Sequence, residues 1–343
     1  MEQQLRFGIV GTGMIANVMA EAIAESTTAE LAAVSSRRLD TAKEFANKYG
    51  SVKAFDSWQD MFSWSGIDAV YVAVPTAFEV EICLAAARSG KHILAEKPFV
   101  NLQSLQSVIA ACRANNVVFM DATHFVHHPR TKHIHDRLEE TIGTTQAIRT
   151  GFFFPFTDRN NIRYNLEIEP TGALGDMAWY SMRAVVEFSS TDAPPDTIKT
   201  FIQRDSETNA IIRAAGLLTF ENGVTSTWDI GYNAGVCLMD LDILGTDGAI
   251  CLDDFVLDWA KGFAFDNPNY NVGYTVRKGM ATPNEFQFIS TPSDKTQQAV
   301  MIEDFVFLTQ NRDREDLCET NIDKSERTQY LLDAIWEKVT QQA

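Results

Sequence analysis

The chain has 343 residues, of which 45% are hydrophobic and 22% are charged. That length exceeds what one hydrophobic core usually serves, so we expect a globular protein of two domains. Lysine and arginine number 29 against 46 aspartate and glutamate residues, which gives a formal net charge of −17. An acidic surface repels phosphate backbones and anionic lipid, and this disfavours nucleic acid and membrane surfaces as partners.

The cysteines and the N-terminus indicate a cellular compartment. No two of the five cysteines form a C-x-x-C pair, and most have apolar neighbours in the sequence; they are Cys83, Cys112, Cys237, Cys251 and Cys318. We therefore expect reduced, mostly buried thiols without a disulfide framework or a structural zinc site. The chain begins without a signal-peptide pattern, and no apolar run approaches the ~20 residues of a membrane-spanning helix. These features predict a cytoplasmic protein.

The first third of the chain alternates strand and helix patterns. Short apolar runs predict strands over 5–10, 30–36, 69–74, 92–95 and 117–120, and helical spacing predicts helices over 14–25, 41–49, 80–89 and 102–115. Strands that alternate with helices pair in parallel and form a doubly wound sheet. The run 69–74 is apolar on both faces, as a sheet covered on both sides requires. We predict a Rossmann-type α/β domain over residues 1–123.

The pattern changes after about residue 144. Strands are predicted over 146–154, 197–203, 210–220, 224–232 and 238–244, with turn signals such as Glu221-Asn222-Gly223 between them. Residues 158–171 are polar and loop-like, and helices are predicted over 172–188, 300–309 and 324–340. We predict a second domain over residues 124–343, of α+β class, with a large and mostly antiparallel open sheet.

A glycine-rich turn separates the first predicted strand from the first predicted helix. Gly11-Thr12-Gly13-Met14-Ile15-Ala16 has the form G-x-G-x-x-A. Gly11 allows a tight turn, Gly13 lets the backbone approach a pyrophosphate, and Ala16 permits close packing of the helix on the strand. The helix N-terminus adds N–H groups and a positive dipole end. A purely structural turn is the alternative, but the setting favours a dinucleotide site over residues 11–15.

The end of the second predicted strand indicates which dinucleotide binds. A site for NAD usually carries Asp or Glu there, to hold the ribose 2′-hydroxyl. This chain reads Ser35-Ser36-Arg37-Arg38, with no carboxylate before Asp40. A carboxylate would repel a 2′-phosphate, whereas the Ser36 hydroxyl and the guanidinium groups of Arg37 and Arg38 would bind one. We predict NADP(H), with NAD bound without an acidic anchor as the alternative.

A lysine follows the strand predicted over 92–95. Glu96-Lys97-Pro98 stands at the carboxyl edge of the sheet, where doubly wound folds collect their ligands. Lys97 can point from there at the nicotinamide end of a dinucleotide. A solvated surface lysine is the alternative, which the apolar strand and Pro98 make less favoured.

A carboxylate and a phenol share one face of the helix predicted over 172–188. Asp176 and Tyr180 stand at positions i and i+4, a spacing that suits acid/base chemistry. Free tyrosine has a pKa of ~10, too high for a base at neutral pH, but a neighbouring ammonium such as that of Lys97 would lower it. Spacing alone favours the structural alternative, in which Asp176 caps the helix and Tyr180 packs.

These motifs together resemble the Gfo/Idh/MocA oxidoreductase family. The resemblance rests on the glycine turn, on Glu96-Lys97-Pro98 and on Gly175-Asp176-x-x-x-Tyr180 at the head of an α+β domain, and it extends to Glu303-Asp304-Phe305 near the end of the chain. The tyrosine in the third motif is similar to the branch that holds glucose–fructose oxidoreductase, dimeric dihydrodiol dehydrogenase and NADP-linked D-xylose dehydrogenase. Many other members carry histidine there.

The resemblance implies roles for the matching residues. Lys97 would sit by the nicotinamide and the reacting oxygen, with Glu96 beside the cofactor. Tyr180 would donate or accept the proton, and Asp176 would orient the substrate or Lys97. Arg163, in Asn161-Ile162-Arg163, stands where relatives also carry Ile-Arg and would touch the substrate.

The loop after the strand over 69–74 is a further part of the implied cofactor site. Val74, Pro75 and Thr76 would line the cofactor cleft, as the corresponding loop does in the family. Relatives often carry histidine four residues after the proline of this loop, whereas this chain has Glu79. That departure puts a cofactor or substrate contact at residue 79 in doubt.

Five of the six histidines crowd one short segment; they are His124, His127, His128, His133 and His135. Such density suggests metal binding. Only Asp121 and Asp136 stand nearby as further ligands, and Pro129 breaks the helix face that would gather the histidines. We therefore predict no metal, and expect the histidines to be partly exposed or to line the cleft, with His124 as a candidate substrate contact near the end of the strand predicted over 117–120.

The sequence as a whole predicts an NADP(H)-dependent oxidoreductase that acts on a sugar, polyol or diol. The resemblance also implies a homodimer or higher homo-oligomer formed through the open face of the second domain's sheet. The rival interpretation is a regulator of the same fold that binds NADP without turning it over, and Lys97, Asp176 and Tyr180 argue against it. A bilin reductase-like activity, also known in the family, is a third and less favoured possibility.

Overall fold

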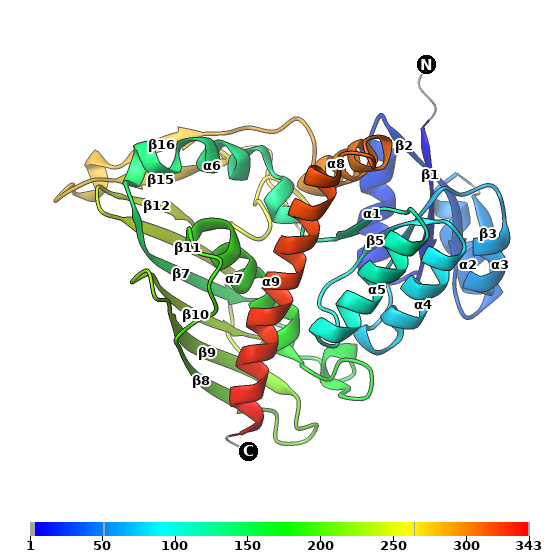
Figure 1. Cartoon of the computed structure of the whole chain (residues 1–343), viewed down its shortest axis with the longest axis horizontal. Helices are drawn as coiled ribbons and strands as arrows, with labels where there is room; N and C mark the ends of the chain where they lie inside the picture. The colour runs from blue at the N-terminus through cyan, green and yellow to red at the C-terminus, as the bar shows by residue number, and fades with distance from the viewer. Residues whose placement is uncertain (1–3, 51, 264, 342–343) are drawn as a thin grey trace. The chain divides into compact units, whose positions relative to one another are not determined.

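The computed structural model describes residues 4–50, 52–263 and 265–341. The chain divides into two compact units, and its elements are labelled in Figure 1. The first unit comprises the chain up to His127 together with Lys295–Glu326, and the second comprises His128–Asp294 together with the chain from Arg327 onward. The sequence pattern assigned all of residues 124–343 to one domain, whereas the structure returns a segment of more than thirty residues to the first unit.

The first unit contains a six-stranded parallel sheet in the order β3-β2-β1-β4-β5-β6, of which β1, β2, β3 and β5 are labelled in Figure 1. Its strands are β1 Leu5–Val10, β2 Ala29–Ser35, β3 Lys53–Phe55, β4 Ala69–Val72, β5 His92–Ala95 and β6 Phe119–Asp121. Its crossover helices are α1 Met14–Glu25, α2 Leu39–Lys48, α3 Trp58–Ser63, α4 Thr76–Arg88 and α5 Leu102–Ala114. The chain adds strands outward from β1, first through β2 to β3 and then through β4 and β5 to β6. This order confirms the predicted doubly wound sheet.

Strand β4 shows why the sheet is apolar on both faces. Its alternate residues enter two different hydrophobic clusters: Ala69 and Tyr71 join one, and Val70 and Val72 join the other. Successive side chains of a strand point to opposite faces, so each cluster marks one covered face of the sheet. The short strand β3 and the helix α3 were not predicted, because segments of three and six residues are too short to display a period.

The segment from Lys295 completes the first unit's core. Helix α8, Gln297–Gln310, packs Phe305 against Phe7 of β1, with ring centroids 5.6 Å apart. Glu25, the last residue of α1, accepts hydrogen bonds from the backbone N–H and the hydroxyl of Thr296, at 3.1 and 2.6 Å. Glu303 likewise accepts the N–H of Thr27, at 3.1 Å. These contacts tie α8 to the loop that follows α1.

The second unit contains an eight-stranded sheet in the order β16-β15-β12-β11-β7-β10-β9-β8 (Figure 1). Among the pairs of neighbouring strands that the structure describes in this sheet, β7 and β10 run parallel and the others run antiparallel. The strands are β7 Thr145–Phe153, β8 Thr197–Arg204, β9 Ile211–Thr219, β10 Thr225–Gly231, β11 Leu238–Gly245, β12 Ala249–Leu252, β15 Gly273–Arg277 and β16 Gln287–Ser290, and a separate two-stranded sheet pairs β13 Lys261–Gly262 with β14 Phe265–Asp266. This confirms the predicted α+β class.

Helix α7, Ala173–Phe188, is buried along almost its whole length. It packs against β7, β9 and β10, in the middle of the sheet. Its N-cap, Gly172, has φ +53°, and a Cβ atom there would lie 2.6 Å from the carbonyl oxygen of Ile211. Glycine therefore lets the start of the helix approach β9 closely.

Helix α6, Pro129–Ile142, shows that one expectation about proline was wrong. Pro129 does not interrupt a helix but opens one, with His128 as the N-cap. Nδ1 of His128 accepts the backbone N–H of Arg130 at 3.0 Å. A proline at the first helical position lacks only an N–H that has no partner within the helix, so the position suits it.

The last helix, α9 Glu315–Thr340, contributes to both units, since its residues up to Glu326 belong to the first and those from Arg327 belong to the second. Three short 3₁₀ segments complete the secondary structure of the described ranges: η1 His124–His127, η2 Ile162–Tyr164 and η3 Pro283–Glu285. Across those ranges, the hydropathy and length needed to cross a bilayer are found together in no helix.

Candidate functional site

The glycine turn stands between β1 and α1, as its sequence predicted. Gly11 has φ +109°, and a Cβ atom there would lie 2.2 Å from the carbonyl oxygen of Ala73. Gly13 is the N-cap of α1, with φ −73°, and a Cβ atom there would meet no atom within 4 Å. The first turn of α1, which includes Met14 and Ile15, carries no acidic residue. The turn thus presents open space and the positive end of a helix dipole, which suits a pyrophosphate.

The residues that follow β2 are accessible. Ser36 is half-buried, and Arg37 and Arg38 are exposed; Arg38 is the N-cap of α2. The backbone N–H of Gly11 donates to the carbonyl of Ser35 at 2.9 Å, so this segment begins beside the glycine turn. Two guanidinium groups next to a helix N-terminus form a place where a phosphate is favourable.

The loop after β4 leads directly into α4. Val74 and Pro75 are half-buried, and Pro75 is the N-cap of the helix. Thr76 is its first residue and is buried, so α4 starts earlier than the predicted 80–89. Glu79 lies in the first turn of α4 and is buried. Its carboxylate therefore stands at the helix end where the dipole is favourable to it.

Lys97 and Glu96 follow β5 at the same edge of the sheet. Both are half-buried, and the peptide bond between Lys97 and Pro98 is cis. The carboxylate of Glu96 accepts a hydrogen bond from the hydroxyl of Tyr71, whose ring is buried in β4. Because β1, β2, β4 and β5 are parallel, the residues that follow them gather along one edge. The structure therefore brings together the predicted cofactor residues of the first unit.

His124 follows β6 and is buried. Its Nδ1 lies 2.9 Å from Nε2 of Gln297 in α8. Burial, and after it the positive charge of Lys97, lowers the pKa of His124 to about 3. The imidazole is therefore neutral at physiological pH and lies within electrostatic range of Lys97. Asp121, at the end of β6, accepts hydrogen bonds from Thr123 and from the hydroxyl of Ser325 in α9.

The five clustered histidines have five different partners. The pairs are His124–Gln297 at 2.9 Å, His127–Asp304 at 2.6 Å, His128–Asp258 at 3.5 Å, His133–Tyr274 at 3.1 Å and His135–Glu187 at 3.0 Å. Within the ranges that the structure describes, no three His, Cys, Asp or Glu side chains are arranged to hold a metal ion. His124 and His128 are buried, His127 and His133 are half-buried, and His135 is exposed.

In the second unit, two donors converge on one oxygen of Asp176. Oδ2 accepts from Nε of Arg163 at 2.6 Å and from the hydroxyl of Tyr232 at 3.1 Å. Burial alone would lower the pKa of Arg163, but the charge of Asp176 holds it above its ordinary value. Burial, and after it the charge of Asp176, raises the pKa of Tyr232 well above its ordinary value. Arg163 therefore stays charged and Tyr232 stays protonated.

Tyr180 lies one turn after Asp176 on α7. It is largely buried, and its ring packs edge-on against Phe152 of β7, with centroids 5.5 Å apart. The ring of Tyr180 is thus packed, as the structural alternative expects. Asp176, however, is engaged by side chains from η2 and from the end of β10.

Tyr232 was not identified from the sequence. It follows β10, 52 positions after Tyr180 in the chain, and no local spacing links it to Asp176. Phe156 and Tyr164 support the same group: Phe156 packs at 5.6 Å against Tyr232 and lies 4.2 Å from the Arg163 guanidinium. The hydroxyl of Tyr164 donates to the carbonyl of Phe156 at 2.7 Å. The sequence does show a run of aromatic residues over 152–156, but no spacing links that run to Asp176 or Tyr232.

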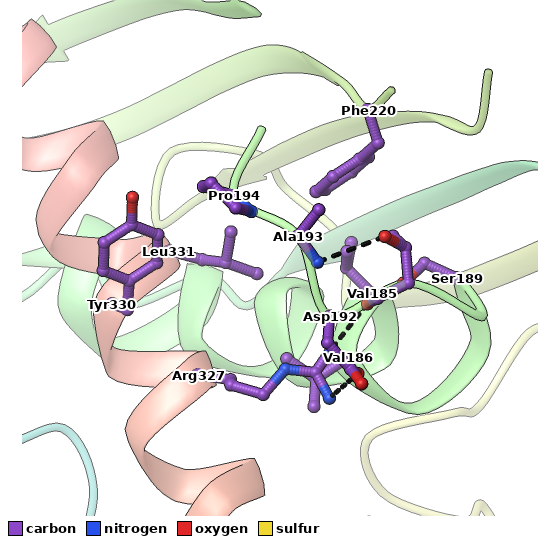
Figure 2. A pocket seen from close by; sticks show the side chains of 11 residues that line it. Val185, Val186, Ser189, Asp192, Ala193, Pro194, Phe220, Arg327, Tyr330 and Leu331 are labelled. Carbon is purple, nitrogen blue, oxygen red and sulfur yellow. Dashed lines mark hydrogen bonds and ion pairs between the residues drawn. The ribbon is translucent and has the colours of Figure 1, made fainter. Parts of the chain in front are cut away.

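A pocket of about 270 Å³ lies elsewhere in the second unit (Figure 2). Its lining comprises Val185, Val186, Ser189, Thr191, Asp192, Ala193, Pro194, Phe220, Arg327, Tyr330 and Leu331. Arg327 of α9 is ion-paired with Asp192 at 2.6 Å. The pocket lies beside the C-terminal end of α7, more than one turn beyond Tyr180. The candidate catalytic residues therefore do not line it.

Two family models match the chain. The model of the GFO/IDH/MocA oxidoreductase family's NAD-binding Rossmann fold matches residues 5–123, and that of the GFO/IDH/MocA C-terminal domain matches residues 132–251. Together they cover more than half of the chain.

Two of the named relatives are a sugar-nucleotide reductase and an inositol dehydrogenase. The dTDP-3,4-didehydro-2,6-dideoxy-alpha-D-glucose 3-reductase of Actinomadura kijaniata is 29% identical over 66% of this chain and 68% of its own length. The NADP(+)-linked scyllo-inositol 2-dehydrogenase of Bacillus subtilis is 36% identical over 43% of this chain and 45% of its own.

A solved structure covers nearly the whole chain. The 3-ketoreductase from Actinomadura kijaniata, in complex with NADP and TDP-benzene, has a TM-score of 0.84 and 23% identity over 98% of both chains. Variants of that ketoreductase with a lysine changed to alanine and with a tyrosine changed to phenylalanine also have crystal structures.

Proposed function

The chain belongs to the GFO/IDH/MocA oxidoreductase family, and from this premise we propose that it transfers hydride between NADP(H) and a carbon of a sugar, polyol or diol. The observation that carries the proposal is the position of Lys97 after β5, at the same sheet edge as the glycine turn after β1. A ligand held by the turn lies along that edge, within reach of a lysine there.

The residues of the first unit fit NADP. The open space at Gly13 admits a pyrophosphate, since a Cβ atom there would meet nothing within 4 Å. Arg37 and Arg38 are exposed at the end of β2, where a 2′-phosphate requires positive charge. The first carboxylate after the strand is Asp40, inside the first turn of α2. The names of the similar inositol dehydrogenase and ketoreductase structure, which mention NADP, support the same choice.

The chemistry divides between cofactor and protein. When bound, NADP⁺ supplies the hydride acceptor. In the direction of oxidation, the carbon of a CH–OH group loses its hydrogen as hydride while the hydroxyl loses a proton, which leaves a carbonyl. We assign the proton to Tyr180, stabilisation of the developing charge on the oxygen to Lys97, and orientation of the substrate to Asp176 with Arg163. His124, held neutral near Lys97, is a further candidate contact.

The first test is a screen for NADP⁺ reduction over aldoses, polyols and diols, followed by Tyr180→Phe and Lys97→Ala on the best substrate. Each variant should lower kcat by at least about a hundredfold, the usual contribution of a positioned acid/base group. Tyr330→Phe is a matched control, because it removes a phenol on α9 outside the proposed site. Full turnover in both site variants would refute the assignment. Tight NADPH binding with no turnover at all would favour the regulator, for which the comparisons offer no support.

The proposal extends to a homodimer or higher homo-oligomer. Helix α7 packs on the middle of the large sheet, and Phe201 of β8 is more than half exposed. Light scattering coupled to size-exclusion chromatography measures the mass in solution, and a monomer would refute this part alone.

A further inference from the structure

The carboxylate of Asp176 is held by two side chains from other parts of the second unit. Its Oδ2 is held from two sides, by Arg163 from η2 at 2.6 Å and by Tyr232 from the end of β10 at 3.1 Å. Two donors from separate elements leave one oxygen little freedom to rotate. Asp176 is therefore fixed in direction as well as in place.

Neither donor can change its role within a normal range of pH. Tyr232 is fully buried, and Arg163 carries a charge that the contact with Asp176 stabilises. Arg163 is also fixed by the face of Phe156, 4.2 Å from the guanidinium carbon. The ring of Tyr232 is fixed in turn by Phe156 and Tyr164, at 5.6 and 6.1 Å. The carboxylate thus keeps both donors, and an ionised carboxylate can only accept hydrogen bonds.

We propose that Tyr232 is a positioning residue which, with Arg163, fixes Asp176 as the acceptor for a second substrate hydroxyl next to the reacting carbon, and so selects vicinal diols and sugars. Asp176 and Tyr180 stand one turn apart on the same face of α7, about 5–6 Å between their Cβ atoms. Two neighbouring hydroxyls on one substrate suit that spacing, one at the phenol and one at the carboxylate. The side chain of Asp176 is 23% exposed, so it is reachable from solvent.

The inference rests on the proposed function, in which Tyr180 and Asp176 serve one substrate. A substrate without the second hydroxyl would leave Asp176 with no group to orient. The effect of Tyr232 should then depend on whether that hydroxyl is present.

The test compares Tyr232→Phe with wild type on matched pairs: D-glucose with 2-deoxy-D-glucose, and cyclohexane-1,2-diol with cyclohexanol. We expect the variant to lower kcat/KM about tenfold to a hundredfold for the vicinal member, the range for one hydrogen bond to a charged group. For the member without the second hydroxyl, kcat/KM should change less than about threefold.

Tyr164→Phe is the matched control, because it also removes the hydroxyl of a buried tyrosine that follows Arg163 in the chain and packs beside Tyr232. The hydroxyl of Tyr164 donates its hydrogen bond to the carbonyl of Phe156 and not to Asp176. It should leave the ratio of kcat/KM between the two members of each pair unchanged. If Tyr232→Phe does not fold, Arg163→Lys tests the other donor with the same pairs and should lower the same ratio.

The outcomes separate the two proposals. An equal loss on both members of a pair would show a merely structural role and overturn this inference alone. A wild-type protein that binds NADPH but oxidises none of the four compounds, nor any other sugar, polyol or diol, would overturn the proposed function and this inference with it.

Discussion

Gly11 and Gly13 belong to one turn, but replacing each with alanine should have a different effect. The first substitution should lower stability and the second should weaken cofactor binding. At Gly11 the backbone has φ +109°, and a Cβ atom would lie 2.2 Å from the carbonyl oxygen of Ala73. At Gly13 the backbone has φ −73°, and a Cβ atom would meet nothing within 4 Å. Gly11→Ala therefore perturbs the fold of the turn, whereas Gly13→Ala fills only the space in front of α1.

The magnitudes follow from these geometries. The backbone strain at Gly11 costs about 1–3 kcal/mol, and separating β1 from the residue after β4 adds to it, so we expect a loss of at least about 3 kcal/mol. For a unit of roughly 160 residues, this lowers the melting midpoint by about 6 °C or more. An alanine N-cap in place of Gly13 costs less than about 1 kcal/mol. Its Cβ should nevertheless raise the Kd for NADPH at least about tenfold, which corresponds to about 1.4 kcal/mol.

Two measurements check this contrast. Scanning calorimetry of the cofactor-free variants reports stability, and isothermal titration with NADPH reports binding. The reasoning would be refuted by a Gly13→Ala protein that melts as low as Gly11→Ala, or by one that binds NADPH as tightly as wild type. A Gly11→Ala protein with an unchanged melting midpoint would refute the account of the turn.

Three further predictions concern the cofactor, pH and the second unit's sheet. Arg37→Ala should raise the KM for NADPH at least about tenfold, the loss expected for a charge-assisted bond to phosphate. The KM for NADH should rise far less. Steady-state kinetics with both cofactors checks this, and equal effects on the two KM values would contradict it. Burial lowers the pKa of His92 to about 4 and that of His124 to about 3, so the unfolded chain alone takes up their protons as pH falls below 6.5. The free energy of unfolding should thus drop by about 2 kcal/mol per histidine between pH 7 and pH 5, as urea titrations at the two pH values would show, and constant stability would count against it. Gly216→Ala should cost about 2 kcal/mol or more, since its Cβ would lie 2.5 Å from the ring of Trp228; an unchanged melting midpoint would disprove this.

Local signals predicted the first unit well. The glycine turn, the strand over 92–95 and the lysine after it could each be identified within a short window, because parallel strands and crossover helices have clear periods. The cofactor residues follow from this, since the ends of parallel strands meet at one edge. The same logic failed for β3, whose three residues show no alternation.

Interactions between distant segments could not be predicted. Asp176 was identified from its spacing to Tyr180, but its partner Tyr232 follows β10 and is placed by the packing of β10 against α7. The histidines between 124 and 135 appeared as one group in the sequence. The 3₁₀ turn and the helix that begins at Pro129 direct them to separate partners, because successive residues of a helix face different directions.

The return of Lys295–Glu326 to the first unit has a consequence for biosynthesis. Chains leave the ribosome from the N-terminus, and domains usually fold as they emerge. Here the ring of Phe305 and the side chain of Glu303, which complete the contacts of β1 and of the loop after α1, are translated long after those segments, since 276 positions separate Glu303 from Thr27. The core around β1 and the contacts of the loop after α1 therefore stay incomplete until this later segment has left the ribosome.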